Sequence, residues 1–193
     1  MFTTKITVPA AITAVALLAG CATTVRTPTE TVNPPPSAAL STFSSFELKP
    51  INTNEVCAKQ SGGDVALSAI QTRLDTGLGG LVKGWNAKKT TATSQKLIIE
   101  PICVDIKLIG TAKRIFTGAL SGSSAVVMKV RYSDAVSGKV IAEPVFYQRA
   151  SAMGAAYSFG ATDRDMLNRI SDLIVSYASR NYPQAVGGPT GLE

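Results

Sequence analysis

The sequence KLIIEPICVDIKLIG, residues 96–110, gives the strongest β-strand signal in this chain of 193 residues. Apolar side chains alternate along it, as expected for a strand that buries one face. Glu100 falls on the apolar face, so we expect it near the strand end or paired with a cation, because an unpaired buried charge is costly. The predicted core face is formed by Ile98, Ile102, Val104, Ile106 and Leu108.

Three further segments have strand patterns. Ser44–Ile51 predicts a short strand that ends at Pro50 or lies at a sheet edge, since proline cannot donate to a ladder. Ser123–Asp134 predicts a strand that continues through a turn into Lys139–Arg149, which gives an antiparallel hairpin. The core-facing side chains of the first hairpin strand are Val126, Met128, Val130 and Tyr132.

Two segments, near residues 64–85 and 163–181, repeat apolar side chains at helical spacing. Thr162 is the expected N-cap of the second helix. The order β-α-β-β-β-α predicts an α+β two-layer sandwich, a mainly antiparallel sheet with two helices on one face. The two predicted buried stripes are Leu67, Ile70, Leu74, Leu78, Leu81 and Val82, then Leu167, Ile170, Ile174 and Tyr177.

The N-terminus has the pattern of a bacterial lipoprotein signal. Lys5 supplies the positive region, and the apolar run up to Leu18 is too short to span a bilayer. Leu18-Ala-Gly-Cys21 matches a lipobox, in which the cysteine takes the lipid and cleavage precedes it. The sequence therefore predicts a signal peptide over residues 1–20 and a membrane anchor, diacylglycerol and palmitate, on Cys21.

Residues 21–42 are rich in Thr, Pro, Ala and Ser and lack apolar periodicity. Pro34–Pro36 favours extended polyproline geometry. We interpret the segment as a tether that spans about 25 Å root-mean-square as a flexible coil. A single globular domain is expected over residues 43–183, followed by a flexible tail over 184–193.

Cys57 and Cys103 are expected to form a disulfide, because unpaired thiols are uncommon in oxidising compartments. Closing a 46-residue loop would contribute about 4 kcal/mol in the chain-entropy model. The alternative is that Cys103 is a small buried hydrophobic residue.

The amino-acid composition disfavours several classes of function. The chain has no histidine, and this absence disfavours triad catalysis and the usual zinc sites. Its formal net charge is +6. Its carboxylates are sparse, so we expect no enzyme, no metal and no cofactor. The basic residues are scattered without interleaved aromatics, which argues against nucleic acid. The Gly/Ser run 118–124 leads into a strand and lacks the Lys of a phosphate loop.

Lys113, Arg114, Ile115 and Phe116 are the candidate partner surface, since two cations beside two apolar side chains suit a protein or a lipid headgroup. A second apolar group could form a groove wall or could cover the open end of the sheet. Its members are Tyr147, Arg149, Met153, Tyr157 and Phe159.

Several ordered motifs resemble an uncharacterised family of proteobacterial lipoproteins that is known as a domain of unknown function. The resemblance implies an envelope lipoprotein with an α/β domain, and it assigns no catalytic residue. More remotely, the element order is similar to small α/β domains of envelope assembly and secretion lipoproteins. The motifs are residues 97–101, 118–124, 130–132, 146–152 and 159–163.

These patterns together predict a non-enzymatic outer-membrane lipoprotein that faces the periplasm. Ala22 follows the lipidated cysteine where an inner-membrane retention signal usually has Asp. The expected partner is another envelope protein or further copies of the chain. An alternative is a tethered accessory protein of a transport system that binds lipid or a small apolar ligand. An enzyme acting on cell wall or glycan is the third hypothesis.

Overall fold

The structure is a computed structural model that describes residues 25–88, 95–109, 122–150 and 161–192. The signal peptide, Cys21 and the Lys113–Phe116 segment lie outside the described residues, as do Met153, Tyr157 and Phe159. None of the described helices is both long and apolar enough to cross a lipid bilayer.

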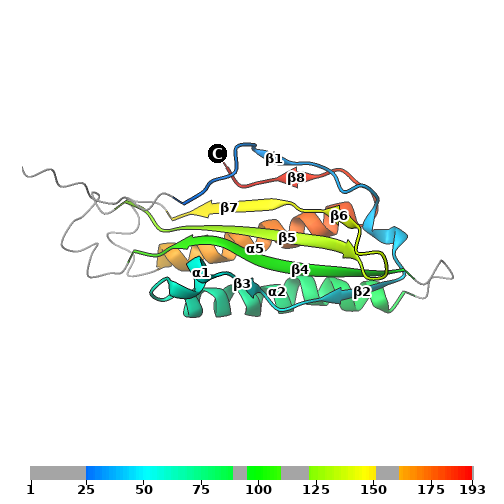
Figure 1. Cartoon of the computed structure of the whole chain (residues 1–193), viewed down its shortest axis with the longest axis horizontal. Helices are drawn as coiled ribbons and strands as arrows, with labels where there is room; N and C mark the ends of the chain where they lie inside the picture. The colour runs from blue at the N-terminus through cyan, green and yellow to red at the C-terminus, as the bar shows by residue number, and fades with distance from the viewer. Residues whose placement is uncertain (1–24, 89–94, 110–121, 151–160, 193) are drawn as a thin grey trace, which may run out of the picture.

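The long strands β4 and β5 form the centre of a six-stranded sheet (Figure 1). β5 is antiparallel to β4 and to β6 and β7, whereas β2 and β3 pair with β4 in parallel. The strands are β2 (Ser45–Leu48), β3 (Asn52–Thr53), β4 (Lys96–Lys107), β5 (Ala125–Asp134), β6 (Val140–Ala142) and β7 (Val145–Arg149).

Two long helices, α2 (Gly63–Asn86) and α5 (Ala161–Asn181), lie side by side over one face of this sheet (Figure 1). A short helix, α1 (Glu55–Lys59), precedes α2, and a 3₁₀ turn, η1 (Leu40–Thr42), precedes β2. The chain is therefore the α+β two-layer sandwich that the sequence predicts, with helices on one face of a mainly antiparallel sheet.

The core lies between the helices and the sheet. The predicted helical stripes are buried, with Leu81 only partly so, and the predicted inner face of β5 is fully buried. The helices touch closely at Gly77, where a Cβ atom would lie 2.9 Å from Cγ2 of Val175. This glycine packs helix against helix, because a larger side chain would push α5 away.

The predicted inner face of β4 is wrong before the bulge in this strand, at Ile98 and Ile102, and right after it, at Ile106 and Leu108. Leu97, Ile99 and Cys103 are fully buried, while Ile98 and Ile102 are half-buried on the other side. Val104 lies at the bulge, and Leu108, which is half-buried, packs against the core. The register shifts between Cys103 and Asp105, and this β-bulge returns Ile106 to the core as predicted. Apolar residues stand on both faces of β4, so the alternation alone could not choose between them.

The disulfide predicted between Cys57 and Cys103 is present, with a Cα–Cα distance of 6.3 Å. Both residues are fully buried. Cys57 lies on α1, which the sequence did not predict, and Asn54 caps this helix by accepting a hydrogen bond from the Cys57 amide at 2.9 Å. The disulfide therefore fixes α1 against the middle of β4.

The N-terminal boundary of the folded part differs from the predicted one at Phe43. Val32 and Asn33 form β1, and Leu40 in η1 is fully buried. The amide of Ser37 donates to the Ile141 carbonyl at 2.9 Å. Residues that were expected to belong to a flexible tether are thus packed on the domain, because the edge of the sheet supplies partners for their backbone.

The expected flexible tail after residue 183 is also ordered. Gly188 and Pro189 form β8, which pairs antiparallel with β1. The Tyr147 amide on β7 donates to the Thr190 carbonyl at 2.8 Å. A turn that requires φ of +74° at Gly187 directs the chain back along the sheet. Residues 184–192 find their partners far away in the sequence. Their local pattern alone therefore predicted a flexible tail.

The start of α5 differs slightly from the predicted one. The helix begins at Ala161, so Thr162 lies in its first turn and is not the N-cap. Boundaries of this kind shift by one or two residues even when the helix itself is correctly predicted.

Candidate functional site

The face of the sheet opposite the helices is the candidate functional surface. From Ile98 to Ile102 of β4 and from Lys129 to Ser133 of β5 it presents side chains that alternate with the core, and each of these is half-buried. Ile98 lies opposite Ser133, Glu100 opposite Arg131 and Ile102 opposite Lys129. We call this surface the open sheet face, since in Figure 1 the long helices lie on the other side.

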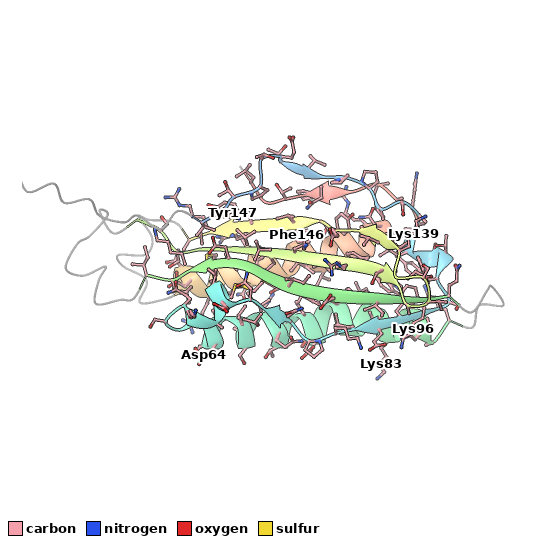
Figure 2. All side chains as sticks on the ribbon, viewed as in Figure 1. Asp64, Lys83, Lys96, Lys139, Phe146 and Tyr147 are labelled. Carbon is pink, nitrogen blue, oxygen red and sulfur yellow. A yellow bond between two sulfur atoms is a disulfide. The ribbon has the colours of Figure 1, made fainter. Side chains whose placement is uncertain are left out.

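A groove of about 560 Å³ lies on the open sheet face, near the start of β4 and the end of β5. Ile98, Val140 and Pro50 give it apolar walls, and Lys49, Glu100 and Arg131 bring both signs of charge. Ser133 and Gly138 complete the lining. We call it the sheet groove. Figure 2 shows Lys96 and Lys139 at this end of the molecule.

Arg131 is oriented by Glu143 from the loop between β6 and β7. Its Nε donates to Oε1 of Glu143 at 2.7 Å, and Lys129 Nζ lies 3.4 Å from the same oxygen. The hydrogen bond from Arg131 lowers the pKa of the Glu143 carboxyl, and the same bond raises the pKa of Arg131. Such exposed pairs contribute little stability, so their main effect is to hold the guanidinium in place at the groove.

The two other carboxylates near the groove are also partnered. Glu100 accepts a hydrogen bond from Nδ2 of Asn52 at 3.0 Å. Glu47 pairs with Lys49 and with Lys96, and the hydrogen bond from Lys49 is the main reason that its pKa falls to about 2. The groove is therefore a surface of paired charges beside apolar side chains, which suits recognition of a mixed apolar and charged segment.

The described residues provide no constellation for catalysis by a metal. Among them, no group of three or more His, Cys, Asp or Glu residues could hold a metal ion. The carboxylates of Glu47, Glu100 and Glu143 accept hydrogen bonds from Lys, Asn and Arg, and none of the hydrogen bonds among the described residues joins them to a Ser or Cys side chain. Each of these carboxylates is therefore held in an ion pair or a hydrogen bond.

Two asparagine side chains cover backbone groups at the edges of the sheet. Asn86 of α2 accepts from the Phe46 amide at 2.8 Å and donates to the Phe46 carbonyl at 2.9 Å. Asn33 makes the same pair of bonds with Val145, each at 2.8 Å. Each amide thus copies the hydrogen bonds of a neighbouring strand, which blocks strand addition at Phe46 and Val145. At these positions a partner must use the face of the sheet and not its edge.

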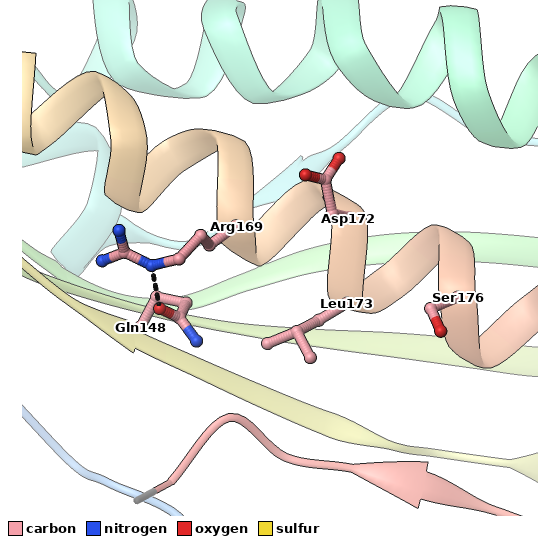
Figure 3. Close-up of a pocket in the computed structure, with 5 residues that line it drawn as sticks. All are labelled: Gln148, Arg169, Asp172, Leu173 and Ser176. Carbon is pink, nitrogen blue, oxygen red and sulfur yellow. Dashed lines mark hydrogen bonds between the residues drawn. The ribbon is translucent and has the colours of Figure 1, made fainter.

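A second pocket of about 340 Å³ lies between α5 and β7 (Figure 3). Arg169 crosses it, donating from Nε to Oε1 of Gln148 at 2.8 Å and from Nη2 to the Arg149 carbonyl at 3.0 Å. Leu173 lines its apolar side. Because the polar groups of Arg169 already bond to β7, this site holds α5 against the sheet as well as enclosing space.

Of the predicted site residues, the structure brings together only Cys57 and Cys103. Cys21 and Lys113–Phe116 lie outside the described residues. Tyr147 and Arg149 are both on β7, where the Tyr147 backbone joins the C-terminal segment. The sheet groove was not predicted, although the outward alternation of Lys129 and Arg131 was visible in the sequence.

The fold and the groove define a small disulfide-bonded α+β domain with a sheet face on which neither of the two long helices lies. No known family model and no curated protein matches its sequence. The similar solved structures include the PelC dodecamer from Paraburkholderia phytofirmans, at 12% identity over 72% of this chain and 93% of that chain, with a TM-score of 0.38.

Two other similar structures come from different bacteria. A putative lipoprotein from Caulobacter crescentus CB15 has 15% identity over 74% of this chain and 91% of its own, with a TM-score of 0.32. Protein XCC0632 from Xanthomonas campestris, described as DUF330, has 10% identity over 75% and 90%, with a TM-score of 0.37. At these scores the likeness carries no argument about what this chain does.

Proposed function

We propose that this chain is a lipoprotein of the outer membrane that faces the periplasm and acts as a non-enzymatic interaction or assembly module. The observation that carries the proposal is the open sheet face with its groove of paired charges beside apolar walls. The lipobox at Cys21 supports the anchor, and the buried disulfide is in keeping with an oxidising compartment.

The proposed partner is another envelope protein that places a mixed apolar and charged segment in the sheet groove. Apolar side chains would pack on Ile98 and Val140, and an acidic group would meet Lys49 or Arg131. Self-association through the same face is the alternative mode. From the sequence alone, Lys113–Phe116 is proposed as an additional contact.

A charge-reversal pair tests the groove. Arg131→Glu breaks the pair with Glu143 at the groove, whereas Arg73→Glu breaks the comparably exposed pair between Arg73 and Asp172 on the helix side. If the groove binds the partner, a complex that co-purifies with the wild type is lost with Arg131→Glu and kept with Arg73→Glu. Equal recovery with both variants contradicts the proposal.

Membrane fractionation tests the anchor. The wild-type chain is expected in the outer-membrane fraction with an acyl group on Cys21, and Cys21→Ala is expected to carry no acyl group and to be lost from that fraction. Recovery of the wild type only in the inner membrane contradicts the proposed location, and an unacylated wild type contradicts the anchor itself.

A second candidate function is a tethered accessory that binds a small apolar ligand. The pocket between α5 and β7 supports it, because about 340 Å³ lies at the lower end of small-molecule sites. Native mass spectrometry of the wild type is expected to show a small-molecule adduct that Leu173→Trp removes. A bare protein in both samples excludes this function for that pocket.

A further inference from the structure

The first described residues run along the sheet and do not lead away from it. We call residues 26–42 the N-terminal strap. The Arg26 amide donates to Oδ2 of Asp105 at 3.2 Å, and Thr190 donates from its amide to the Thr31 carbonyl at 2.9 Å. Further along, the Tyr177 hydroxyl donates to the Pro34 carbonyl at 2.9 Å. The strap therefore belongs to the folded domain from its first residues.

This packing shortens the tether. Only residues 22–25 separate Cys21 from Arg26. A fully extended chain advances at most about 3.6 Å per residue, so Cys21 lies within roughly 18 Å of Arg26. A tether that continued to residue 42 would reach about four times as far by the same measure.

Arg26 marks one particular end of the molecule. It bonds to Asp105 close to the end of β4, where β5 starts, β7 ends, and both α2 and α5 begin (Figure 1). The opposite end holds η1, the turn after β5 and the last residues of α2. β4 has 12 residues, and a strand rises about 3.3 Å per residue, so the two ends lie roughly 36 Å apart.

We infer that the Arg26 end faces the lipid bilayer and that the sheet groove is presented on the distal half of the domain. This inference rests on the proposed lipidation of Cys21. The surface composition does not distinguish the ends, since exposed valines stand at both: Val56 and Val65 near Arg26, and Val136 and Val140 at the far end. The assignment of the membrane-facing end therefore rests on the short connection between Cys21 and Arg26.

Single labels on the mature, lipidated full chain test this orientation. Arg149→Cys places a thiol at the Arg26 end and Val136→Cys places one at the far end, where Val136 is 85% exposed. The native disulfide leaves Cys57 and Cys103 unreactive. The chain is reconstituted in vesicles of phosphatidylethanolamine and phosphatidylglycerol with a quencher on the headgroups, and the fluorescence of each label is measured.

The label at Arg149 is expected to be quenched at least about threefold more than that at Val136, because the two ends differ by roughly 36 Å. Arg164→Cys and Lys139→Cys, both exposed, repeat the comparison at the same two ends in case one variant folds poorly. A 20-residue Gly/Ser insertion after Ala22 keeps the anchor and is expected to reduce the difference between the two labels.

Two outcomes would overturn the inference, and they differ from each other. Equal quenching at both ends of an acylated, vesicle-bound protein overturns the orientation and leaves the proposed anchor intact. A chain that lacks the acyl mass on Cys21 and does not float with the vesicles overturns both the anchor and the orientation.

Discussion

Asparagine amides replace missing backbone partners at several points of this molecule. Besides Asn33 and Asn86 at the sheet edges, Asn181 at the end of α5 is fully buried. Its Oδ1 accepts from the amides of Val186 and Gly187, each at 2.8 Å, and its Nδ2 donates to the carbonyls of Tyr177 and Gly187. One side chain therefore forms the turn that returns the C-terminal segment to the sheet.

Replacing Asn181 tests the strength of that turn. Asn181→Ala leaves buried backbone groups without partners, and each such group costs about 1–3 kcal/mol. We expect the free energy of unfolding, measured in urea, to fall by about 2–4 kcal/mol, while the exposed control Ser179→Ala changes it by less than about 0.5 kcal/mol. Equal effects of the two variants would show that the turn does not depend on this amide.

Two neighbouring tyrosines should respond in opposite ways to loss of the hydroxyl. The Tyr132 hydroxyl is buried and has no hydrogen-bond partner among the described residues, and burial raises its pKa. Burial also raises the pKa of Tyr177, to about 12, but that hydroxyl donates to the Pro34 carbonyl. Tyr132→Phe is therefore expected to be neutral or stabilising by up to about 1 kcal/mol, and Tyr177→Phe to destabilise by about 1 kcal/mol. Chemical denaturation of both variants checks this, and a larger loss for Tyr132→Phe would contradict the assignment of the bonds.

At the scale of the elements, periodicity predicted the helices well and the strands unevenly. The stripes of α2 and α5 extend over several turns, so a few ambiguous positions did not change the result. In β4, Ile98 and Ile99 are adjacent and apolar, and the bulge after Cys103 reverses which positions face the core. A two-residue period cannot reveal a bulge, because the bulge itself breaks that period.

The disulfide between α1 and β4 should dominate the stability of that region. Cys57→Ala with Cys103→Ala opens a loop whose ends are 46 residues apart, and the chain-entropy model gives a loss of about 4 kcal/mol. Thermal unfolding of the double variant and of the reduced wild type measures it. If both unfold at the same temperature as the oxidised wild type, the disulfide contributes nothing to the fold.

The carboxylates of the open sheet face and of the hairpin turn give a defined pH dependence. Hydrogen bonds lower the pKa values of Glu47, Glu143 and Asp134, the last mainly through Ser137. A depressed pKa in the folded state stabilises it above the unfolded pKa, and this is lost as the pH falls through the folded value. For Glu47 the window runs from 4.5 down to about 2.

We therefore expect the urea midpoint to be constant from pH 7 to about 5 and to fall below 4.5. Glu47→Gln should flatten the lowest part of that curve, whereas the exposed control Glu55→Gln, whose pair with Lys59 lies within one turn of α1, should follow the wild type. A midpoint that rises as the pH falls through this range would show that these carboxylates do not stabilise the folded state in their charged form.

At the scale of the whole molecule, the N-terminal strap and the C-terminal segment close one side of the sheet together. β1 and β8 pair with each other, and both connect to β7 through Asn33 and Thr190. These partners are more than 100 residues apart for Asn33 and Val145. The proline and threonine content of residues 21–42 predicted a tether, because composition reports local preference and cannot reveal distant partners.

A matched pair in the strap distinguishes a packed segment from a tether. Leu40 is fully buried, whereas Val32 is 61% exposed. Leu40→Ala is expected to lower the free energy of unfolding by about 2–4 kcal/mol, and Val32→Ala to change it by less than about 0.5 kcal/mol. Urea unfolding of the two variants measures the difference, and a tether would give no loss for either.

The candidate site was less predictable than the fold. Lys113–Phe116 were selected because cations stand beside apolar residues in the sequence, and they lie outside the described residues. The sheet groove combines Lys49, Ile98, Arg131 and Val140 from four separate segments. No single segment carries that pattern, so the groove became visible only when the strands were placed side by side.

Crosslinking in the living cell tests the central claim, that the open sheet face binds an envelope partner. A photoreactive amino acid at Val140, in the sheet groove and 46% exposed, is compared with one at Thr72 on the exposed side of α2. We expect a discrete product at Val140 that Arg131→Glu removes, and no such product at Thr72. The same product at Thr72, or one at Val140 that survives Arg131→Glu, would contradict it.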